Sequence, residues 1–489
     1  MNLKFGLVTL LISSFLASIV QFNFGKTEIT LEKLDTDNGQ YIYYDLYKPK
    51  IASEKNKVPF IAIIPGFQRS KEALSNIAIE LSRRGYVVGL IDPYAQGLSS
   101  SSRSRIAATT QGYGMFALIE HVNESSDFNY INKELLGSTG HSMGGNAAIR
   151  GANYFGKKAD EQNKKSLLHS VYVSGYVLTL RDDVLKDVRS NVGVSYALYD
   201  EGSFRNELKN WDAANMKIAP ESLRTVNSGL KKEEHISEVE LGKYYGDLES
   251  NTLRVIFNEE LLHPFQPYNA EATANQLAYF ETVFGTPIKL DTYDQIWQWK
   301  EFFTLLNMII SFWLLIPLTR TLLKINFFKT LVKPIPEALP VQNRVGKTIF
   351  WSVFFVSAGI ACVTFIPLVE VAKTLFPEAA TRQLTWFFPQ RMNNSVMLWA
   401  LLNGSIGIFL FFVTYYFFGK KHGVKINSWG LKLSFKDIYK TILLGLIIFI
   451  VYFSLLFLIY FLFHIDQKLQ PILQALPCIA RIPSATPSL

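Results

Sequence analysis

Cysteine is scarce in this chain of 489 residues, which contains only Cys362 and Cys478. Both lie in or after an apolar C-terminal region, so the more charged region before it, residues 26–300, cannot form an internal disulfide. Histidine is also sparse, with seven in the whole chain. The sequence has no His-x-x-x-His pair and no cluster of His and Asp of the kind that binds zinc. We therefore expect no metal ion and no other cofactor.

Charged residues are missing from five long runs of the sequence. The runs cover residues 5–24, 302–319, 348–369, 396–419 and 441–464. A helix needs about 20 apolar residues to cross a bilayer, so each run is predicted to be a transmembrane helix. Residues 26–300, in contrast, mix charged and apolar side chains and are predicted to be water-soluble.

The distribution of basic residues predicts the membrane topology. The chain carries 49 Lys and Arg against 41 Asp and Glu, a net charge of +8. The loop between the second and third runs and the loop between the fourth and fifth each hold six Lys and Arg. Because such residues are enriched in cytoplasmic loops, both loops are predicted to be cytoplasmic and residues 26–300 extracytoplasmic. We expect an integral protein of a cell membrane, taken to be bacterial, that binds no nucleic acid.

These patterns divide the chain into four parts. Residues 1–25 form either a transmembrane signal anchor or a cleaved signal peptide. The poor small-x-small site at its end favours the anchor, and both versions export the next part. Residues 26–290 form the soluble domain, residues 300–465 a transmembrane domain of four helices, and residues 466–489 a Pro-rich tail. Inside the soluble domain, the charged insert 202–251 is either a helical cap or an exposed helical excursion.

Residues 140–144 read Gly-His-Ser-Met-Gly, which fits the pattern G-x-S-x-G. The glycines on either side of Ser142 permit the sharp turn that exposes a serine hydroxyl. Leu135 and Leu136 before the motif are typical of a short strand, and residues 145–150 after it are typical of a helix start. Strand, turn and helix are the setting that a nucleophile elbow requires. We therefore interpret Ser142 as a nucleophile rather than as part of a plain Gly/Ser-rich turn.

Strand and helix patterns alternate through the soluble region. Two segments of alternating polarity, 28–34 and 40–47, flank Asn38-Gly39 and predict a β-hairpin. Further strands are expected at residues 58–64, 86–91, 170–177, 192–199 and 253–258, and a helix is expected near 270–284. Strands that alternate with helices favour a mostly parallel sheet covered on both faces. The predicted fold class is therefore α/β, followed by an all-α transmembrane domain.

Together these segments resemble the α/β-hydrolase superfamily over about residues 27–286. The motifs that carry the resemblance are Pro65-Gly66-Phe67, Asp92 to Gly97, the elbow from Gly140 to Gly145, Tyr199-Asp200-Glu201 and Leu262-His263-Pro264-Phe265. The run Gly-His-Ser-Met-Gly-Gly is similar to that of serine esterases, lipases and dienelactone-hydrolase-like members. The resemblance implies an α/β-hydrolase sheet that presents a hydrolytic serine.

The chain order of the family is nucleophile, acid and histidine, and Ser142, Asp200 and His263 follow it. The resemblance implies that Ser142 is acylated and that His263 accepts its proton and returns it to the leaving group. Asp200 is implied to orient the imidazole and to stabilise its charged form.

Other parts of the site are less sharply defined by the resemblance. Alternatives to Asp200 are other acids near strand ends: Glu201, Asp182 and Asp183. The backbone N–H groups of Phe67 and Met143 are implied to form the oxyanion hole. His141, inside the elbow, is predicted to direct its side chain away.

The predicted function is that of a membrane-anchored serine hydrolase of the esterase or lipase kind. It would cleave carboxylic esters, of lipids or of other molecules near the cell envelope, through a Ser-His-Asp triad and an acyl-enzyme. A peptidase or amidase that uses the same triad is an alternative. A second alternative is a ligand-binding or transport-associated membrane protein with a hydrolase-like domain. The sequence makes no prediction about oligomeric state.

Overall fold

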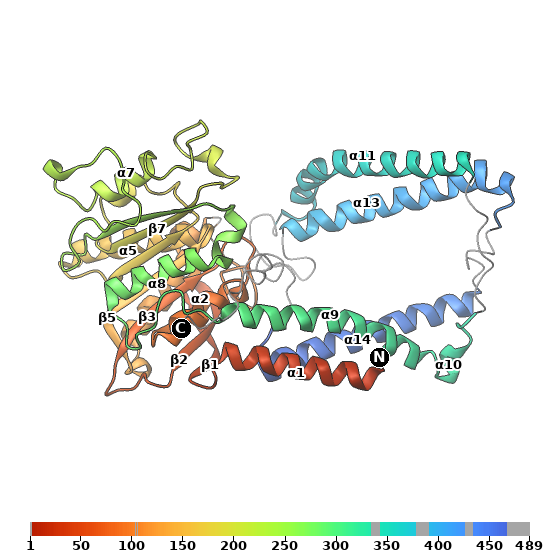
Figure 1. The fold of residues 1–489 in the computed structure, drawn as a ribbon, viewed down its shortest axis with the longest axis horizontal. Coiled ribbons are helices and arrows are strands. Elements are labelled where there is room, and N and C mark those ends of the chain that lie inside the picture. Colours follow the sequence, from red (N-terminus) through yellow and green to blue (C-terminus); the bar gives the residue numbers. More distant parts are fainter. Residues whose placement is uncertain are drawn as a thin grey trace, which may run out of the picture. The chain divides into compact units, whose positions relative to one another are not determined.

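The computed structural model describes residues 2–102, 104, 106–333, 343–377, 391–425 and 434–466. It divides into two compact units, drawn in Figure 1 as ribbons coloured along the sequence. The sheet unit comprises Leu11–Met308 and the chain from Ile459 onward, and the helical unit comprises the residues up to Leu10 and Ile309–Leu458. The predicted tail after Asp466, with Cys478, lies outside the described residues.

The sheet unit contains one sheet of eight strands in the order β1-β2-β4-β3-β5-β6-β7-β8. The strands are β1 (Thr27–Thr36), β2 (Gln40–Pro49), β3 (Val58–Ile64), β4 (Val87–Ile91), β5 (Ile131–His141), β6 (Ser170–Ser174), β7 (Asn191–Ala197) and β8 (Arg254–Glu259). β2 pairs antiparallel with both β1 and β4. Every pairing from β4 to β8 is parallel. This mostly parallel sheet confirms the predicted fold class.

Helices cover both faces of this sheet (Figure 1). They are α2 (Ser75–Arg83), α3 (Ala107–Thr110), α4 (Met115–Glu124), α5 (Met143–Gln162), α6 (Asp182–Leu185), α7 (Pro220–Asn227) and α8 (Ala270–Phe284). In the central strand β3, Phe60, Ala62 and Ile64 belong to the core that includes residues of α4 and α5. Ile61 and Ile63 belong to the opposite core, with residues of α2 and α8. Because both faces of β3 are buried, its sequence is a continuous apolar run.

The predicted strands form with small differences at their ends. The hairpin of β1 and β2 pairs from Thr27↔Pro49 to Thr36↔Gln40, as expected. β5 is longer than the short strand predicted before the elbow, because it pairs with β3 on one side and β6 on the other. β6 ends earlier than predicted, at Ser174, because Gly175 adopts a φ of +65° and turns the chain.

The insert 202–251 consists mostly of turns, with α7 as an α-helical segment. Ala214, Met216 and Val226 are buried in the same core as residues of α5. The Met216 N–H donates to Asn258 Oδ1 at the end of β8, at 3.0 Å. The insert therefore packs as part of the sheet unit and is less helical than expected. Both predicted alternatives for the insert, a cap over the site and an exposed excursion, stay predictions.

Long apolar helices make up the helical unit. They are α1 (Leu3–Gln21), α9 (Trp297–Leu322), α11 (Arg344–Leu375), α13 (Arg391–Thr414) and α14 (Phe435–Phe463), and the short α10 (Asn326–Lys329) follows α9. Parts of three of them, α1, α9 and α14, belong to the sheet unit. Among the described residues, five helices are long and apolar enough to cross a membrane, and they overlap the five predicted runs. α11 and α13 pack together, with the Trp399 indole N–H donating to the Ala361 carbonyl at 2.8 Å. Membrane insertion and its orientation stay predictions.

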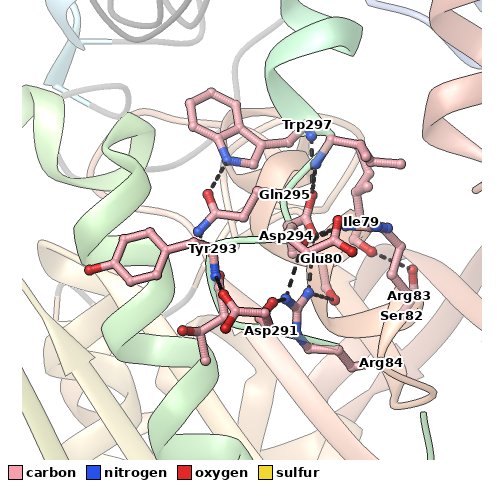
Figure 2. Close-up of polar contacts among 12 residues, drawn as sticks. Ile79, Glu80, Ser82, Arg83, Arg84, Asp291, Tyr293, Asp294, Gln295 and Trp297 are labelled. Atoms are coloured by element: carbon pink, nitrogen blue, oxygen red, sulfur yellow. Dashed lines mark hydrogen bonds and ion pairs between the residues drawn. The ribbon is translucent and has the colours of Figure 1, made fainter. Parts of the chain in front are cut away.

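The start of α9 is tied to α2 by a buried carboxylate, Glu80 (Figure 2). Its Oε1 accepts the backbone N–H groups of Ile296 at 2.7 Å and Trp297 at 3.1 Å. Its Oε2 accepts from the Arg83 and Arg84 guanidinium groups at 2.7 and 3.1 Å. A carboxylate at a helix N-terminus satisfies free N–H groups and faces the positive end of the helix dipole. Glu80 thus holds the first turn of α9 on the sheet unit.

Candidate active site

Ser142 lies at the junction of β5 and α5 in a strained backbone conformation. Its φ is 58° and its ψ is −122°, a region that costs free energy for a residue with a side chain. Two hydrogen bonds hold it there: the Ser142 N–H donates to the Ser174 carbonyl at 2.8 Å, and the Ser142 carbonyl accepts from the Asn146 N–H at 3.1 Å. A Cβ at Gly144 would collide with the Ile64 carbonyl. The second glycine of the motif is therefore required by a close backbone approach.

His263 and Asp200 are brought together from different strand ends. The His263 Nδ1 lies 2.9 Å from Asp200 Oδ2, and Asp200 Oδ1 accepts the Gly202 N–H at 2.6 Å. Asp200 is 6% exposed. Burial raises the pKa of this carboxyl, but the hydrogen bond and the nearby charge of His263 and the Gly202 N–H outweigh it, so the pKa of Asp200 lies below its ordinary value. A carboxylate that stays ionised beside an imidazole can orient it.

The three alternative acids, unlike Asp200, have exposed side chains. Glu201 is exposed next to Asp200, and Asp182 is exposed at the start of α6. Asp183 is also exposed and pairs with Arg181 at 3.0 Å. The structure therefore places Asp200, rather than Asp183, against His263.

His141 lies beside His263, so the prediction that its side chain points away was wrong. The two ring centroids are 4.5 Å apart with an angle of 38° between the planes. Burial lowers the pKa of His141 well below its ordinary value, and His263 and Arg69 lower it further. His141 is therefore neutral at pH 7. This contact places the His263 ring beside the residue that directly precedes Ser142.

The loop after β3 passes directly beside Ser142. A Cβ placed on Gly66 would lie 3.1 Å from both the Ser142 Cβ and the His141 carbonyl oxygen. Phe67 follows at once on this loop, and Met143 is the first residue of α5. The first N–H groups of a helix have no acceptor within the helix. Both residues predicted to supply the oxyanion hole thus adjoin the serine.

A buried polar network supports the turn that carries His263. Glu259, at the end of β8, accepts from the Ser195 hydroxyl at 2.8 Å, from Gln266 Nε2 at 3.2 Å and from Asn275 Nδ2 at 2.9 Å. Gln266 belongs to the same short 3₁₀ turn as His263, residues His263–Tyr268. Burial raises the pKa of Glu259, against the lowering effect of these hydrogen bonds. Sequence reasoning missed this network; the only signal was an acid at the end of a predicted strand.

Asp92, which the family resemblance singled out, fixes two backbone segments. Its Oδ1 accepts the Lys71 N–H at 2.8 Å and its Oδ2 accepts the Leu98 N–H at 3.0 Å. Burial and the nearby Glu72 raise the pKa of Asp92 to about 6, against the lowering effect of Lys71. Gly97 adopts a φ of +55°, and a Cβ there would collide with the Asp92 carboxyl. The spacing Asp92 to Gly97 therefore describes a tight turn wrapped around this carboxylate.

One family model and several solved structures are similar to parts of this chain. The model of the family described as PETase, PET hydrolase-like, matches residues 16–201, which is less than half of the chain. No curated protein shows a significant match to the sequence. A solved esterase from Pyrococcus furiosus is 11% identical with a TM-score of 0.36, over 53% of this chain and 93% of its own.

Two further solved structures are similar to the same degree. An α/β hydrolase from a Penicillium species is 12% identical with a TM-score of 0.35, over 53% of this chain and 99% of its own. A dienelactone hydrolase from Anabaena variabilis is 13% identical with a TM-score of 0.33, over the same shares. Because these TM-scores are low, the fold is assigned from the strand order and pairing of this chain's own sheet and not from the similarity to these structures. The family match spans Ser142 and Asp200, ends before His263, and supports a hydrolase.

Proposed function

We propose that this protein is a membrane-anchored serine hydrolase that cleaves carboxylic esters through an acyl-enzyme. The single observation that carries the proposal is the contact of His263 Nδ1 with Asp200 Oδ2 at 2.9 Å, next to a strained serine elbow. A serine hydroxyl needs an adjacent base to attack a carbonyl, and the base needs a third group that orients it. Ser142, His263 and Asp200 have the residue types for these three roles, and His263 contacts both Asp200 and His141, the residue that precedes Ser142.

In the proposed reaction, the Ser142 hydroxyl attacks the ester carbonyl while His263 takes its proton on Nε2, the nitrogen opposite Asp200. The negative oxygen of the tetrahedral intermediate accepts hydrogen bonds from the N–H groups of Phe67 and Met143. His263 then returns the proton to the departing alcohol and the acyl-enzyme forms. Water, activated by His263, repeats the sequence and releases the acid.

Esters of lipids, or of other molecules close to the cell envelope, are the proposed substrates. Two features support this choice: the candidate membrane helices on both sides of the sheet unit in sequence, and the exposed side chains of Phe67 and Leu262 next to the proposed oxyanion hole and base. A site with apolar side chains at its edge favours an apolar acyl or alcohol group. A lipid or envelope ester meets that requirement where the protein is anchored.

Labelling of intact cells with a membrane-impermeant fluorophosphonate tests the nucleophile and the topology together. We expect the wild-type chain to be labelled and Ser142→Ala to remain unlabelled. Ser237→Ala, a change of an exposed serine in the insert, is the matched control and should label like wild type. Hydrolysis of p-nitrophenyl butyrate by the purified full chain in detergent should follow the same pattern.

Each other result contradicts a defined part of the proposal. Labelling that appears only after lysis would leave the hydrolase but refute the extracytoplasmic orientation. Absence of both labelling and hydrolysis in folded wild-type protein would refute the hydrolase. Cleavage of p-nitroanilide substrates with little ester turnover would redirect the proposal to an amidase or peptidase.

A further inference from the structure

A buried cluster of charged side chains lies directly behind the proposed oxyanion loop, residues 65–70. At its centre is Lys71, whose side chain is 1% exposed. The Lys71 Nζ donates hydrogen bonds to Glu72 Oε1 at 2.9 Å and to the Tyr460 hydroxyl at 2.8 Å. It also forms an ion pair with Asp45 Oδ2 at 3.4 Å. Of the three donors of an ammonium, one is therefore used on the C-terminal end of α14.

Two of the groups in this cluster come from the C-terminal end of α14. Tyr460 lies in its last turn, and His464 Nε2 lies 3.0 Å from Asp45 Oδ2. The rings of Tyr460 and His464 stack with centroids 5.4 Å apart. His464 has a φ of 56°, which ends the helix in a left-handed turn. That turn brings its imidazole to β2. The segment belongs to the sheet unit although it lies far from the unit's strands in sequence.

Lys71 directly follows the oxyanion loop and anchors its C-terminal end. The end of β3 before the loop is held by β4 and β5 on either side. At the other end, the Lys71 N–H donates to Asp92 Oδ1 at 2.8 Å. Within the loop the Arg69 N–H donates to the Gly66 carbonyl at 3.2 Å, and Gln68 adopts a φ of 56°, a conformation that persists only where the surroundings hold it. What holds Lys71 therefore contributes to the path of the loop that carries the Phe67 N–H.

The residues that follow Lys71 are also held by hydrogen bonds from the start of α9 and from the His263 turn. Lys300, in the first turn of α9, is fully buried and donates to Ser75 Oγ at 3.2 Å and to Asp466 Oδ1 at 3.3 Å. Tyr268, in the turn that carries His263, donates its hydroxyl to the Ala73 carbonyl at 2.7 Å. The segment 71–75 is thus held between the His263 turn and the ends of two candidate membrane helices.

We propose that the end of α14 positions the oxyanion loop, with Tyr460 and His464 acting through Lys71 and Asp45 as positioning residues for the ester hydrolysis proposed above. This inference rests on that proposed function. The buried lysine has an electrostatic reason: without its charge, the buried carboxylates of Asp45 and Asp92 and the partly buried carboxylate of Glu72 would lose their shared cation. Buried charges need such pairing.

The test compares Tyr460→Phe with wild type, using the purified full chain in detergent. Phenylalanine keeps the ring and removes one acceptor from a buried ammonium, so the loop loses part of its support. We expect kcat for an activated ester to fall about 10-fold, with KM changed less than twofold. That loss is smaller than the roughly 100–1,000-fold expected when an oxyanion donor is removed outright. Tyr452→Phe, on the same helix with its hydroxyl near Ser311, is the control and should match wild type.

A matched pair of substrates separates positioning from general loosening. Sulfur accepts hydrogen bonds weakly, so a thionoester gains less from the oxyanion hole than the oxygen ester does. Displacement of the Phe67 N–H should therefore lower the rate for the oxygen ester several-fold more than the rate for the thionoester. An equal loss on both substrates, with a lower melting temperature, would show a merely structural contact and overturn the inference.

His464 supplies a second, independent pair of variants in case Tyr460→Phe fails to fold. His464→Ala should lower kcat on the oxygen ester, and His464→Gln, which keeps a donor toward Asp45, should restore most of it. Rates within twofold of wild type for both Tyr460→Phe and His464→Ala would refute the inference. Wild type is measured beside each variant, so an inactive wild-type enzyme would instead refute the proposed hydrolase.

Discussion

Replacement of Asp200 by asparagine tests the proposed triad most directly, because the structure shows what each amide orientation would do. Asp200 now accepts two N–H groups, from His263 on Oδ2 and from Gly202 on Oδ1. An asparagine that turns its NH₂ toward Gly202 places that donor next to the Gly202 N–H, which is also a donor, so no hydrogen bond forms. One that turns its NH₂ toward His263 requires a proton-free Nδ1. The proton then moves to Nε2, which can no longer accept the proton of Ser142.

The expected loss is large because an amide NH₂ against the Gly202 N–H, now 2.6 Å from Oδ1, disfavours the first orientation and leaves the second. Holding the wrong tautomer of a triad histidine costs about 10⁴-fold in kcat in a serine protease, which is about 5.5 kcal/mol at 1.36 kcal/mol per factor of ten. We expect a fall of about 10³–10⁴-fold for Asp200→Asn, because the site keeps Ser142 and the oxyanion donors. KM should change far less, since the carboxylate lies behind the imidazole and away from the substrate.

The assay is ester hydrolysis by the full chain in detergent, with fluorophosphonate labelling rates as a second readout. Glu201→Gln changes the neighbouring exposed acid and should stay within about twofold of wild type. An Asp200→Asn enzyme within tenfold of wild type would refute the orienting role of this carboxylate. If Glu201→Gln or Asp183→Asn gave the large loss instead, the acid of the triad would be reassigned to that residue.

Three further predictions follow from buried groups around the site. Gly144→Ala places a methyl against the Ile64 carbonyl, so we expect the protein to lose about 1–3 kcal/mol of stability. We also expect kcat to fall at least about 100-fold, because Met143 shifts. Gly359→Ala is the control: its added methyl meets nothing within 4 Å, so the melting temperature should stay unchanged or rise. Glu80→Gln breaks two buried ion pairs, with Arg83 and Arg84, and weakens the cap of α9 (Figure 2). This should cost about 3–5 kcal/mol, and an unchanged melting temperature would contradict this role. Asp92 has a folded pKa of about 6, above its unfolded value of about 3.9. Its contribution to stability is therefore present below about pH 4 and is lost as the pH rises to about 6, and chemical unfolding across that range, compared with Asp92→Asn, measures it.

Local sequence patterns predicted the fold and the position of the elbow in the candidate site. The elbow was predictable because glycine requirements, the preceding apolar strand and the following helix all lie within a few residues of Ser142. The contact of Asp200 with His263 agrees with the family resemblance that proposed both residues. Parallel strands deliver their C-terminal ends to one edge of a sheet, and β7 and β8 end shortly before Asp200 and His263. In each case the residue's position depends on backbone geometry that its immediate neighbours determine.

The contacts that sequence reasoning missed are those made across the sheet. The sequence predicted that the His141 side chain points away. Its direction depends on whether there is space beside His263, and only the packing of β5, β6 and the His263 turn decides that. In the sequence, Glu259 looks like any acid at a strand end. Only the structure shows that Ser195, Gln266 and Asn275 donate hydrogen bonds to it. A charged residue in a sequence is by default a solvated one, so a buried carboxylate has no local signature.

Lys71 and Tyr460 show why the remaining part of the site lay beyond sequence reasoning. They lie 389 positions apart, and each has an ordinary local explanation: Lys71 as a loop lysine and Tyr460 as an aromatic residue near the end of an apolar helix. Only burial distinguishes them, because a lysine side chain at 1% exposure needs every one of its donors satisfied. The chain uses its last helix for one of those bonds. If the sheet unit needed the apolar helices only as an anchor, any apolar residue at position 460 would serve. The hydroxyl on Lys71 and the imidazole on Asp45 instead make the end of that helix part of the structure on which the proposed chemistry depends.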